Sequence, residues 1–142
     1  MAKAACRSLT GKAIVKLKPH QLGFGVHLGA EAAVHAARVF LENLKSGQAL
    51  LKVDFSNAFN TLRRDCMLST VHRDLPELYD FVNSCYSNPS FLRFGPYTLL
   101  SDEGCQQGDP LGPLLFCATV MPLINRLQSI FQRVVYGRWN NR

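Results

Sequence analysis

The stretch that decides the fold is apolar and ends at an acidic residue, and it reads Ala49-Leu50-Leu51-Lys52-Val53-Asp54-Phe55. A short run of Leu and Val predicts a strand in the middle of a sheet, covered on both faces. A carboxylate at the end of a buried strand is costly unless it is paired or bound to a cation. Asp54 is therefore a candidate ligand for a hard cation. The alternatives are a helix cap and an ion pair with Arg63 or Arg64.

A second informative stretch is rich in glycine and proline and reads Gly104-Cys105-Gln106-Gln107-Gly108-Asp109-Pro110-Leu111-Gly112-Pro113. Asp109 followed by Pro110 predicts the start of a helix, because the aspartate can cap it and proline suits its first turn. A flexible loop that enters a helix can approach phosphates or a base pair closely. The alternative is an ordinary turn before a capped helix, which would form without any ligand.

The rest of the chain predicts helices and short strands in an α+β arrangement, with helices packed on one small antiparallel sheet. Ser56 is a candidate cap for a helix whose buried stripe is Phe59, Leu62 and Cys66, with Arg63 and Arg64 facing outward. The other expected helices span residues 2–17, 30–45, 77–85 and 110–130. The other expected strands are a hairpin at residues 91–94 and 97–100 and a final strand that begins near Val134.

The length of 142 residues indicates one domain, which we expect to span the whole chain. The net charge of +6 is concentrated at the N-terminus, where residues 1–18 contain no acidic residue. Such a segment suits a phosphate backbone or an anionic lipid, and the alternative is a solvated helix face. Its candidate nucleic-acid-binding residues are Lys3, Arg7, Lys12, Lys16 and Lys18.

The five cysteines have neither CxxC nor zinc-ligand spacing. Reduced thiols are therefore expected, without a disulfide-linked partner and in the cytoplasm or nucleus. The longest apolar stretch, residues 114–124, is too short to cross a bilayer, so no membrane association is expected.

Three stretches together resemble the reverse transcriptase domain of non-LTR, LINE-like retrotransposons. Residues 54–60, DFSNAFN, are similar to motif A, and residues 106–116, QQGDPLGPLLF, are similar to motif B. Residues 19–31 look like the segment that precedes motif A, with His20-Gln21-Leu22-Gly23 and Gly29-Ala30-Glu31. The order and the spacing of the three agree with that family.

The resemblance implies a role for each matching residue. Asp54 and the backbone carbonyl of Phe55 would bind catalytic Mg²⁺. Phe59 stands at the position of the steric gate against a ribose 2′-hydroxyl, and its alternative role is a core aromatic. Gln107 and Gly108 match the residues that contact the incoming nucleotide and the template. The implied partners are an RNA template, a DNA primer and a dNTP, and the implied reaction is nucleotidyl transfer with two Mg²⁺ ions.

The family also has a Tyr-x-Asp-Asp motif, which is not found in this sequence. The sequence contains no Asp-Asp pair, and no acidic residue follows Asp109. We therefore expect a partial fingers and palm of a right-hand polymerase, truncated, with a divergent tail at residues 131–142. We expect this chain to be inactive alone. The alternative function is a non-catalytic RNA- or protein-binding module derived from a reverse transcriptase.

Overall fold

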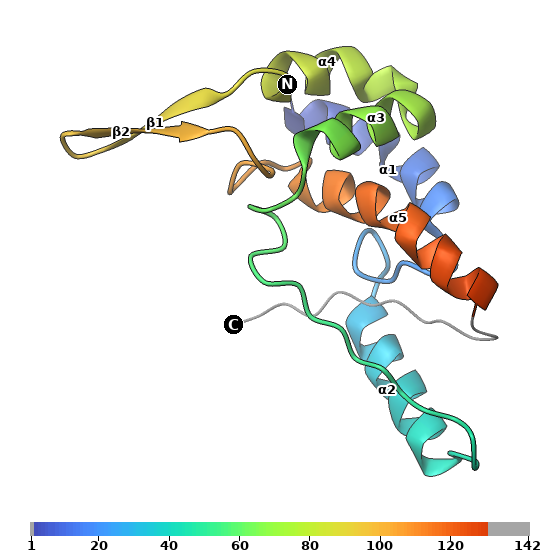
Figure 1. Ribbon diagram of the computed structural model, residues 1–142. Helices are drawn as coiled ribbons and strands as arrows, with labels where there is room; N and C mark the ends of the chain where they lie inside the picture. Colours follow the sequence, from blue (N-terminus) through green and yellow to red (C-terminus); the bar gives the residue numbers. More distant parts are fainter. Residues whose placement is uncertain (1, 131–142) are drawn as a thin grey trace.

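The computed structural model describes residues 2–130, and within them the chain forms five helices and one two-stranded sheet (Figure 1). The elements in chain order are α1 (Ala2–Leu17), α2 (Gly29–Glu42), α3 (Arg64–Asp74), α4 (Pro76–Tyr86), β1 (Ser90–Phe94), β2 (Tyr97–Ser101) and α5 (Gly112–Ile130). The predicted α+β class is confirmed. The tail at residues 131–142, with the strand expected near Val134, lies outside the described residues.

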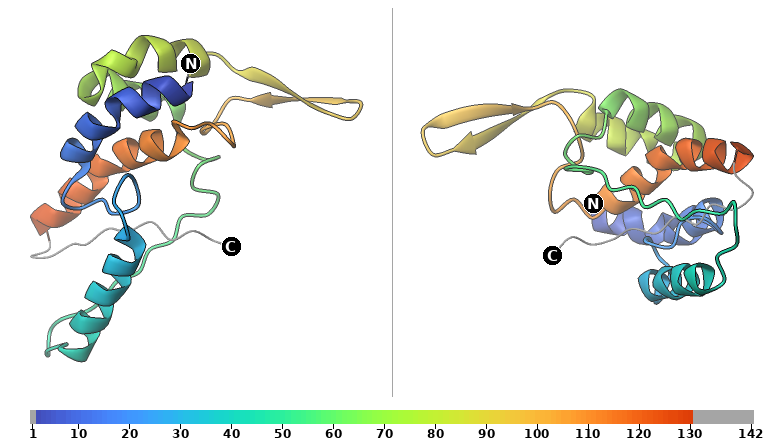
Figure 2. Two further views of the ribbon diagram at one scale, coloured as in Figure 1. Left: turned by 180° about the vertical axis from the view of Figure 1, so that it is seen from behind. Right: turned by 60° about the horizontal axis from the view of Figure 1, so that its bottom comes forward.

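Four helices make the core of the molecule. α3 packs against both α4 and α5, and α1 packs against α5 (Figures 1 and 2). Their contact surfaces are completely or almost completely buried, and the largest side chains there are Met67, Val71, Leu78, Val82, Leu111, Leu114 and Leu115. We call α1, α3, α4 and α5 the helical body.

Local sequence explains where the helices of the body begin and end. Pro76 occupies the first turn of α4, where its missing N–H costs nothing. Proline also disfavours a helical conformation in the residue before it, so α3 ends at Asp74 and Leu75 separates the two helices. Before α5, Asp109 Oδ1 accepts a hydrogen bond from the Leu111 N–H at 2.9 Å. This is the capping contact expected for Asp109.

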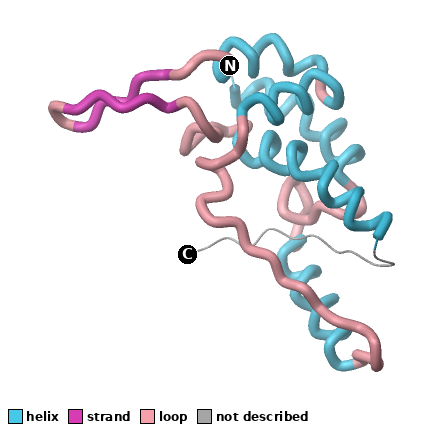
Figure 3. Tube along the Cα trace, in the orientation of Figure 1, coloured by secondary structure: helices cyan, strands magenta, loops and turns pink. Residues whose placement is uncertain are grey.

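The predicted central strand at residues 49–55 is wrong. These residues belong to an extended loop that joins α2 to the body, drawn as the long pink tube in Figure 3. Leu51 is 80% exposed and Val53 is 60% exposed. A strand needs a neighbour for its backbone groups, and no strand within residues 2–130 pairs with this stretch. We call residues 43–55 the exposed segment.

The sheet is instead the predicted hairpin, in which Phe91 pairs with Leu100 and Phe94 pairs with Tyr97 across an antiparallel ladder. Gly95 takes a left-handed φ of 59° in its turn. The hairpin projects from the helical body, and α2 extends from it in another direction (Figures 1 and 2). Both faces of the hairpin are therefore largely exposed.

The helix predicted from Ser56 also differs from the structure. Residues 56–61 form turns, and the helix begins at Arg64. Asn57 has a φ of 49°, a left-handed conformation that interrupts a helix and that asparagine tolerates better than most residues. The buried stripe is consequently Arg64, Met67 and Val71. Cys66, predicted to be buried, is exposed.

Candidate nucleotide site

The structure brings the two motif-like stretches into direct contact. The Gly104 N–H donates to the Leu62 carbonyl, and the Cys105 N–H donates to the Phe59 carbonyl, both at 2.8 Å. These two backbone bonds join the turn after Asp54 to the start of the 104–109 loop. The turn and the loop therefore hold each other in place.

Gly104 is required by this close approach. Its φ is 67°, and a Cβ atom built on it would lie 2.4–2.5 Å from backbone atoms of Asn60. Only a residue without a side chain fits between the loop and the turn. Gly108 differs, because its φ is 88° but a Cβ there would meet no atom within 4 Å. Gly108 faces open space, as a position for a ligand requires.

Phe116, near the start of α5, contacts two aromatic residues of the other stretch. Its ring centroid lies 5.1 Å from that of Phe59 and 6.2 Å from that of Phe55. Phe116 is buried, Phe59 is half-buried and Phe55 is 40% exposed. Phe59 therefore packs against the core, as its alternative role required, and this packing also suits a rigid gate.

Tyr86, the last residue of α4, fixes the far side of the loop. Its hydroxyl donates to Asp109 Oδ2 and accepts a hydrogen bond from the Gln106 N–H at 3.2 Å. Burial, followed by the hydrogen bond to Asp109, raises the pKa of the Tyr86 hydroxyl far above its ordinary value. Asp109 thus binds Leu111 through one oxygen and Tyr86 through the other, which is a structural role.

The expected nucleotide-contacting and metal-binding residues are accessible. Asp54, Gln107 and Gly108 are all exposed to solvent. Asp54 lies on the exposed segment, directly before the Phe55 contact with α5. Gln107 and Gly108 lie on the loop that Gly104, Cys105 and Tyr86 anchor. Backbone hydrogen bonds connect Phe59 to the loop that carries Gln107. Asp54 adjoins this contact through its neighbour Phe55, whose ring lies against Phe116.

A resident magnesium ion does not fit the described residues. No group of three or more His, Cys, Asp and Glu side chains that could hold a metal lies within residues 2–130. Mg²⁺ often binds one or two carboxylates and takes its remaining ligands from substrate phosphates and water. Asp54 is a single exposed carboxylate. It therefore fits an Mg²⁺ ion only if a bound nucleotide supplies most of the other ligands.

Four of the five basic N-terminal residues form two groups on opposite edges of α1, and Lys18 is exposed in the turn directly after this helix. Lys12 forms an ion pair of 2.9 Å with Glu77, and the Lys16 ammonium donates to the Asp74 carbonyl at the end of α3. Lys3 and Arg7 are exposed and follow each other by one helical turn on another side of α1. Lys12 and Lys16 therefore attach α1 to α3 and α4, and the basic residues do not form one continuous patch.

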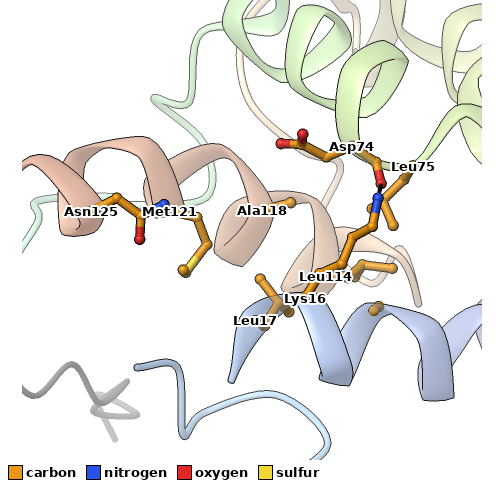
Figure 4. A pocket seen from close by; sticks show the side chains of 9 residues that line it. Lys16, Leu17, Asp74, Leu75, Leu114, Ala118, Met121 and Asn125 are labelled. Atoms are coloured by element: carbon orange, nitrogen blue, oxygen red, sulfur yellow. Dashed lines mark hydrogen bonds between the residues drawn. The ribbon is translucent and has the colours of Figure 1, made fainter. Parts of the chain in front are cut away.

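Lys16 also borders a cavity of about 270 Å³, shown in Figure 4. The cavity lies between α1, the end of α3 and α5, and Leu17, Leu114, Ala118 and Met121 supply most of its apolar wall. Lys16 is the only residue lining it that was a predicted site residue. The cavity is thus separate from the 104–109 loop.

Comparison with known proteins identifies the family of this chain. The sequence model of the family described as reverse transcriptase (RNA-dependent DNA polymerase) matches residues 3–138. No curated protein and no solved structure matches the chain. Since the match covers nearly the whole sequence, the chain belongs to the reverse transcriptase family. Its members bind nucleic acid and typically use Mg²⁺. No helix in the part described, residues 2–130, is long and apolar enough to cross a membrane.

Sequence reasoning missed three residues that shape the site, namely Arg64, Tyr86 and Gly104. Arg64 was expected to face outward but is 8% exposed. Arg64, Met67 and Val71 have the spacing of residues on one helix face, and this spacing could have indicated that Arg64 is buried. The sequence alone gave no reason to prefer that stripe to Phe59, Leu62 and Cys66, which has the same spacing.

Proposed function

We propose that this chain is the part of a retrotransposon reverse transcriptase, of the non-LTR, LINE-like type, that contacts the incoming nucleotide and the template. The observation that carries the proposal is the pair of backbone bonds between the turn after Asp54 and the 104–109 loop. They place Phe59 beside a loop whose Gln107 and Gly108 are exposed. This arrangement suits a pocket with a rigid aromatic wall and an accessible loop opposite it.

The roles within this pocket follow from the chemistry of each residue. The Gln107 amide can donate and accept hydrogen bonds to a nucleotide, and the open space at Gly108 admits a close approach to the backbone. Phe59, braced by Phe116, can exclude a ribose 2′-hydroxyl by steric contact. Asp54 and the Phe55 carbonyl would hold an Mg²⁺ that accompanies the nucleotide. When bound, such ions neutralise charge on the transferred phosphate.

We further propose that the chain binds nucleotide and primer–template but does not extend the primer by itself. The motivation is the single carboxylate at the expected metal position, together with a sequence that has no Asp-Asp pair. Positioning and neutralisation of charge supply most of the acceleration in phosphoryl-transfer sites, and one carboxylate provides little of either.

The test uses the purified chain with an oligo(rA)–oligo(dT) duplex, dTTP and Mg²⁺. Calorimetry is expected to detect dTTP binding to the chain–duplex complex, with about tenfold weaker binding for Gln107→Ala, since one side chain's hydrogen bonds are worth that much. Primer extension is expected to be undetectable. No dTTP binding would refute the nucleotide site, and extension that Asp54→Ala abolishes would refute the proposed inactivity.

A non-catalytic RNA- or protein-binding module is the second candidate, and the β1–β2 hairpin favours it. Phe91, Phe94 and Tyr97 are 67–75% exposed on this ribbon, and Arg93 lies between them in sequence. Exposed aromatic rings can stack on unpaired bases, and arginine can bind phosphate. Filter binding of single-stranded RNA across a salt series tests this function. A steep loss of affinity with salt would support phosphate contacts, and salt-independent binding would count against them.

The intracellular compartment, cytoplasm or nucleus, is part of the same proposal. No disulfide joins the cysteines within residues 2–130, and Cys66 and Cys85 are exposed. Exposed thiols suit a reducing compartment. Fluorescence microscopy of the tagged chain would test it, and secretion into the medium would contradict it.

A further inference from the structure

Arg64, the first residue of α3, is a buried cation that pairs with no carboxylate group in the part of the chain that the structure describes. Its side chain is almost completely buried, and none of the ion pairs within residues 2–130 includes it. A buried charge is costly unless hydrogen bonds satisfy it. The acceptors that satisfy Arg64 therefore indicate what the residue holds.

All of its acceptors lie on one stretch, from the end of β2 to the 104–109 loop. The Nε atom donates to the Gly104 carbonyl at 3.0 Å, and Nη1 donates to the Ser101 carbonyl at 2.8 Å. The Nη2 atom donates to Ser101 Oγ at 3.0 Å and to the Glu103 carbonyl at 3.2 Å. Arg64 thus makes four hydrogen bonds to a segment 37–40 residues away in sequence.

Only arginine can make this set of contacts. The guanidinium directs its donors in one plane with fixed angles, whereas a lysine ammonium is a compact charge on a flexible stem. The Arg64 Cζ atom also lies 5.3 Å from the centre of the Tyr86 ring, in a cation–π contact. The same tyrosine binds Asp109 and Gln106 through its hydroxyl. Arg64 therefore reaches both ends of the 104–109 loop, one directly and the other through Tyr86.

We propose that Arg64 is a positioning residue that fixes the Gln107–Gly108 loop at a set distance from the turn after Asp54. This inference rests on the proposed nucleotide site, because it assigns a function to the spacing between the two halves of that site. Arg64 is suited to the role because α3 begins directly after the turn, so its backbone belongs to one half and its side chain holds the other.

The buried thiol of Cys105 reports on the loop independently of any nucleotide. Burial raises its pKa to about 12, so little reactive thiolate forms while the loop is held. Cys117, on α5, is equally buried and lies outside the loop. Release of the loop would expose Cys105 alone, whereas unfolding of the body would expose both.

The test compares Arg64→Lys with Arg63→Lys, since the two arginines are adjacent but Arg63 is exposed and pairs with Asp65. Iodoacetamide labelling is followed at each cysteine by peptide mass spectrometry. We expect Arg64→Lys to accelerate labelling of Cys105 roughly tenfold or more, from the loss of several charged hydrogen bonds, with Cys117 unchanged. Arg63→Lys should change neither rate. Tyr86→Phe, which deletes only the hydroxyl, should accelerate Cys105 labelling to a smaller extent.

A second measurement connects the position of the loop to the site. With the oligo(rA)–oligo(dT) duplex bound, Arg64→Lys should weaken dTTP binding about tenfold, by the same loss of contacts, and leave duplex affinity unchanged. Equal acceleration at Cys105 and Cys117, or none at Cys105, would overturn the positioning role. Normal dTTP binding with an exposed Cys105 would also overturn it. Wild-type protein that protects Cys105 but binds no dTTP would refute the nucleotide site while leaving Arg64 established as the holder of the loop.

Discussion

The helical body and the exposed segment both contain large apolar residues but differ in how these residues are buried. Leu115 in α5 has no exposed surface, whereas Leu51 in the exposed segment is 80% exposed. A helix satisfies its own backbone groups, so it needs a neighbour only for one face. A strand needs a neighbour even for its hydrogen bonds. Within residues 2–130, the helices and the short-range hairpin therefore form regular structure. The strand-like stretch at residues 49–55 does not, because no strand there pairs with it.

This difference divides the candidate site. The loop that we propose contacts the nucleotide is anchored in the body through Gly104, Cys105 and Tyr86. Asp54 lies on the exposed segment, and the Phe55–Phe116 contact at its end is a single edge-on ring pair at 6.2 Å. Among the described residues, the loop half of the candidate site is therefore held to the body by more contacts than the Asp54 half.

Limited proteolysis should reveal the largest contrast between the two regions. Trypsin should cut after Lys45 and Lys52, on the exposed segment, well before it cuts after Arg64 in the body. Local opening costs almost nothing in an exposed loop but approaches the full unfolding free energy in a core, so we expect rates that differ roughly a thousandfold. Mass spectrometry of the timed digest measures the order. Equally fast cleavage after Arg64 would mean that the body is not stably folded.

Truncation of matched leucines should give the next largest effect. Leu115→Ala should lower the free energy of unfolding by about 2–5 kcal/mol, because it leaves a cavity in the core. Leu51→Ala should change it by less than about 0.5 kcal/mol, as for other exposed positions. Urea unfolding followed by circular dichroism measures both. A large loss for Leu51→Ala would show that the exposed segment packs against something in solution.

Two glycines of the loop sharpen the comparison further. Gly104→Ala should cost about 2–4 kcal/mol, from a left-handed φ and from overlap with the Asn60 backbone. Gly108→Ala meets no atom within 4 Å, so only the left-handed φ penalises it, by about 1–2 kcal/mol. The same urea experiment measures the pair. A cost for Gly108→Ala equal to that of Gly104→Ala would contradict the open position of Gly108.

The smallest expected effect is at the ion pair between Lys12 and Glu77, which joins α1 to α4 at the surface of the body. The hydrogen bond from Lys12 holds the pKa of Glu77 below its ordinary value. A carboxyl group with a lowered pKa stabilises the folded state above its unfolded pKa of about 4.3, and this stability is lost as the pH falls through the folded value. Glu77→Gln should therefore be slightly less stable than wild type at pH 7.

The difference between Glu77→Gln and wild type should shrink as the pH falls below about 4.3 and in 1 M salt, which screens exposed charges. A double-mutant cycle with Lys12→Gln isolates the pair from other effects of each change. A difference that persists at low pH would assign the effect to packing of the Glu77 side chain.

Much of the fold could be predicted because its signals are local. Helical spacing predicted α2, two prolines marked the limits of α4, and Asp109-Pro110 predicted the start of α5. Gly95-Pro96 between two apolar runs predicted the hairpin. The cap at Asp109 depends on a bond to a residue two positions away, which is also local. Such features require no knowledge of distant parts of the chain.

The predictions that were wrong concerned features that depend on contacts distant in sequence or on the backbone conformation of one residue. The strand at residues 49–55 had the right composition but has no partner within the described residues. Asn57 adopts a left-handed conformation that composition does not specify, and it moved the start of α3 to Arg64. The burial of Arg64 depends on carbonyl groups about 40 residues further on. The order of residue types along the chain does not show which distant residues will be in contact.

The separation of 40 residues between Arg64 and Gly104 also has a consequence for the order of folding. The intervening chain contains α3, α4 and the hairpin, which form through contacts that are close in sequence. Contacts that close a long loop cost more chain entropy, so they form later than contacts between residues that are close in sequence. On the ribosome, the turn after Asp54 emerges well before the loop that fixes it. The turn therefore lacks its backbone bonds to the loop until synthesis has passed Cys105, so we expect the proposed nucleotide pocket to form late among the described residues.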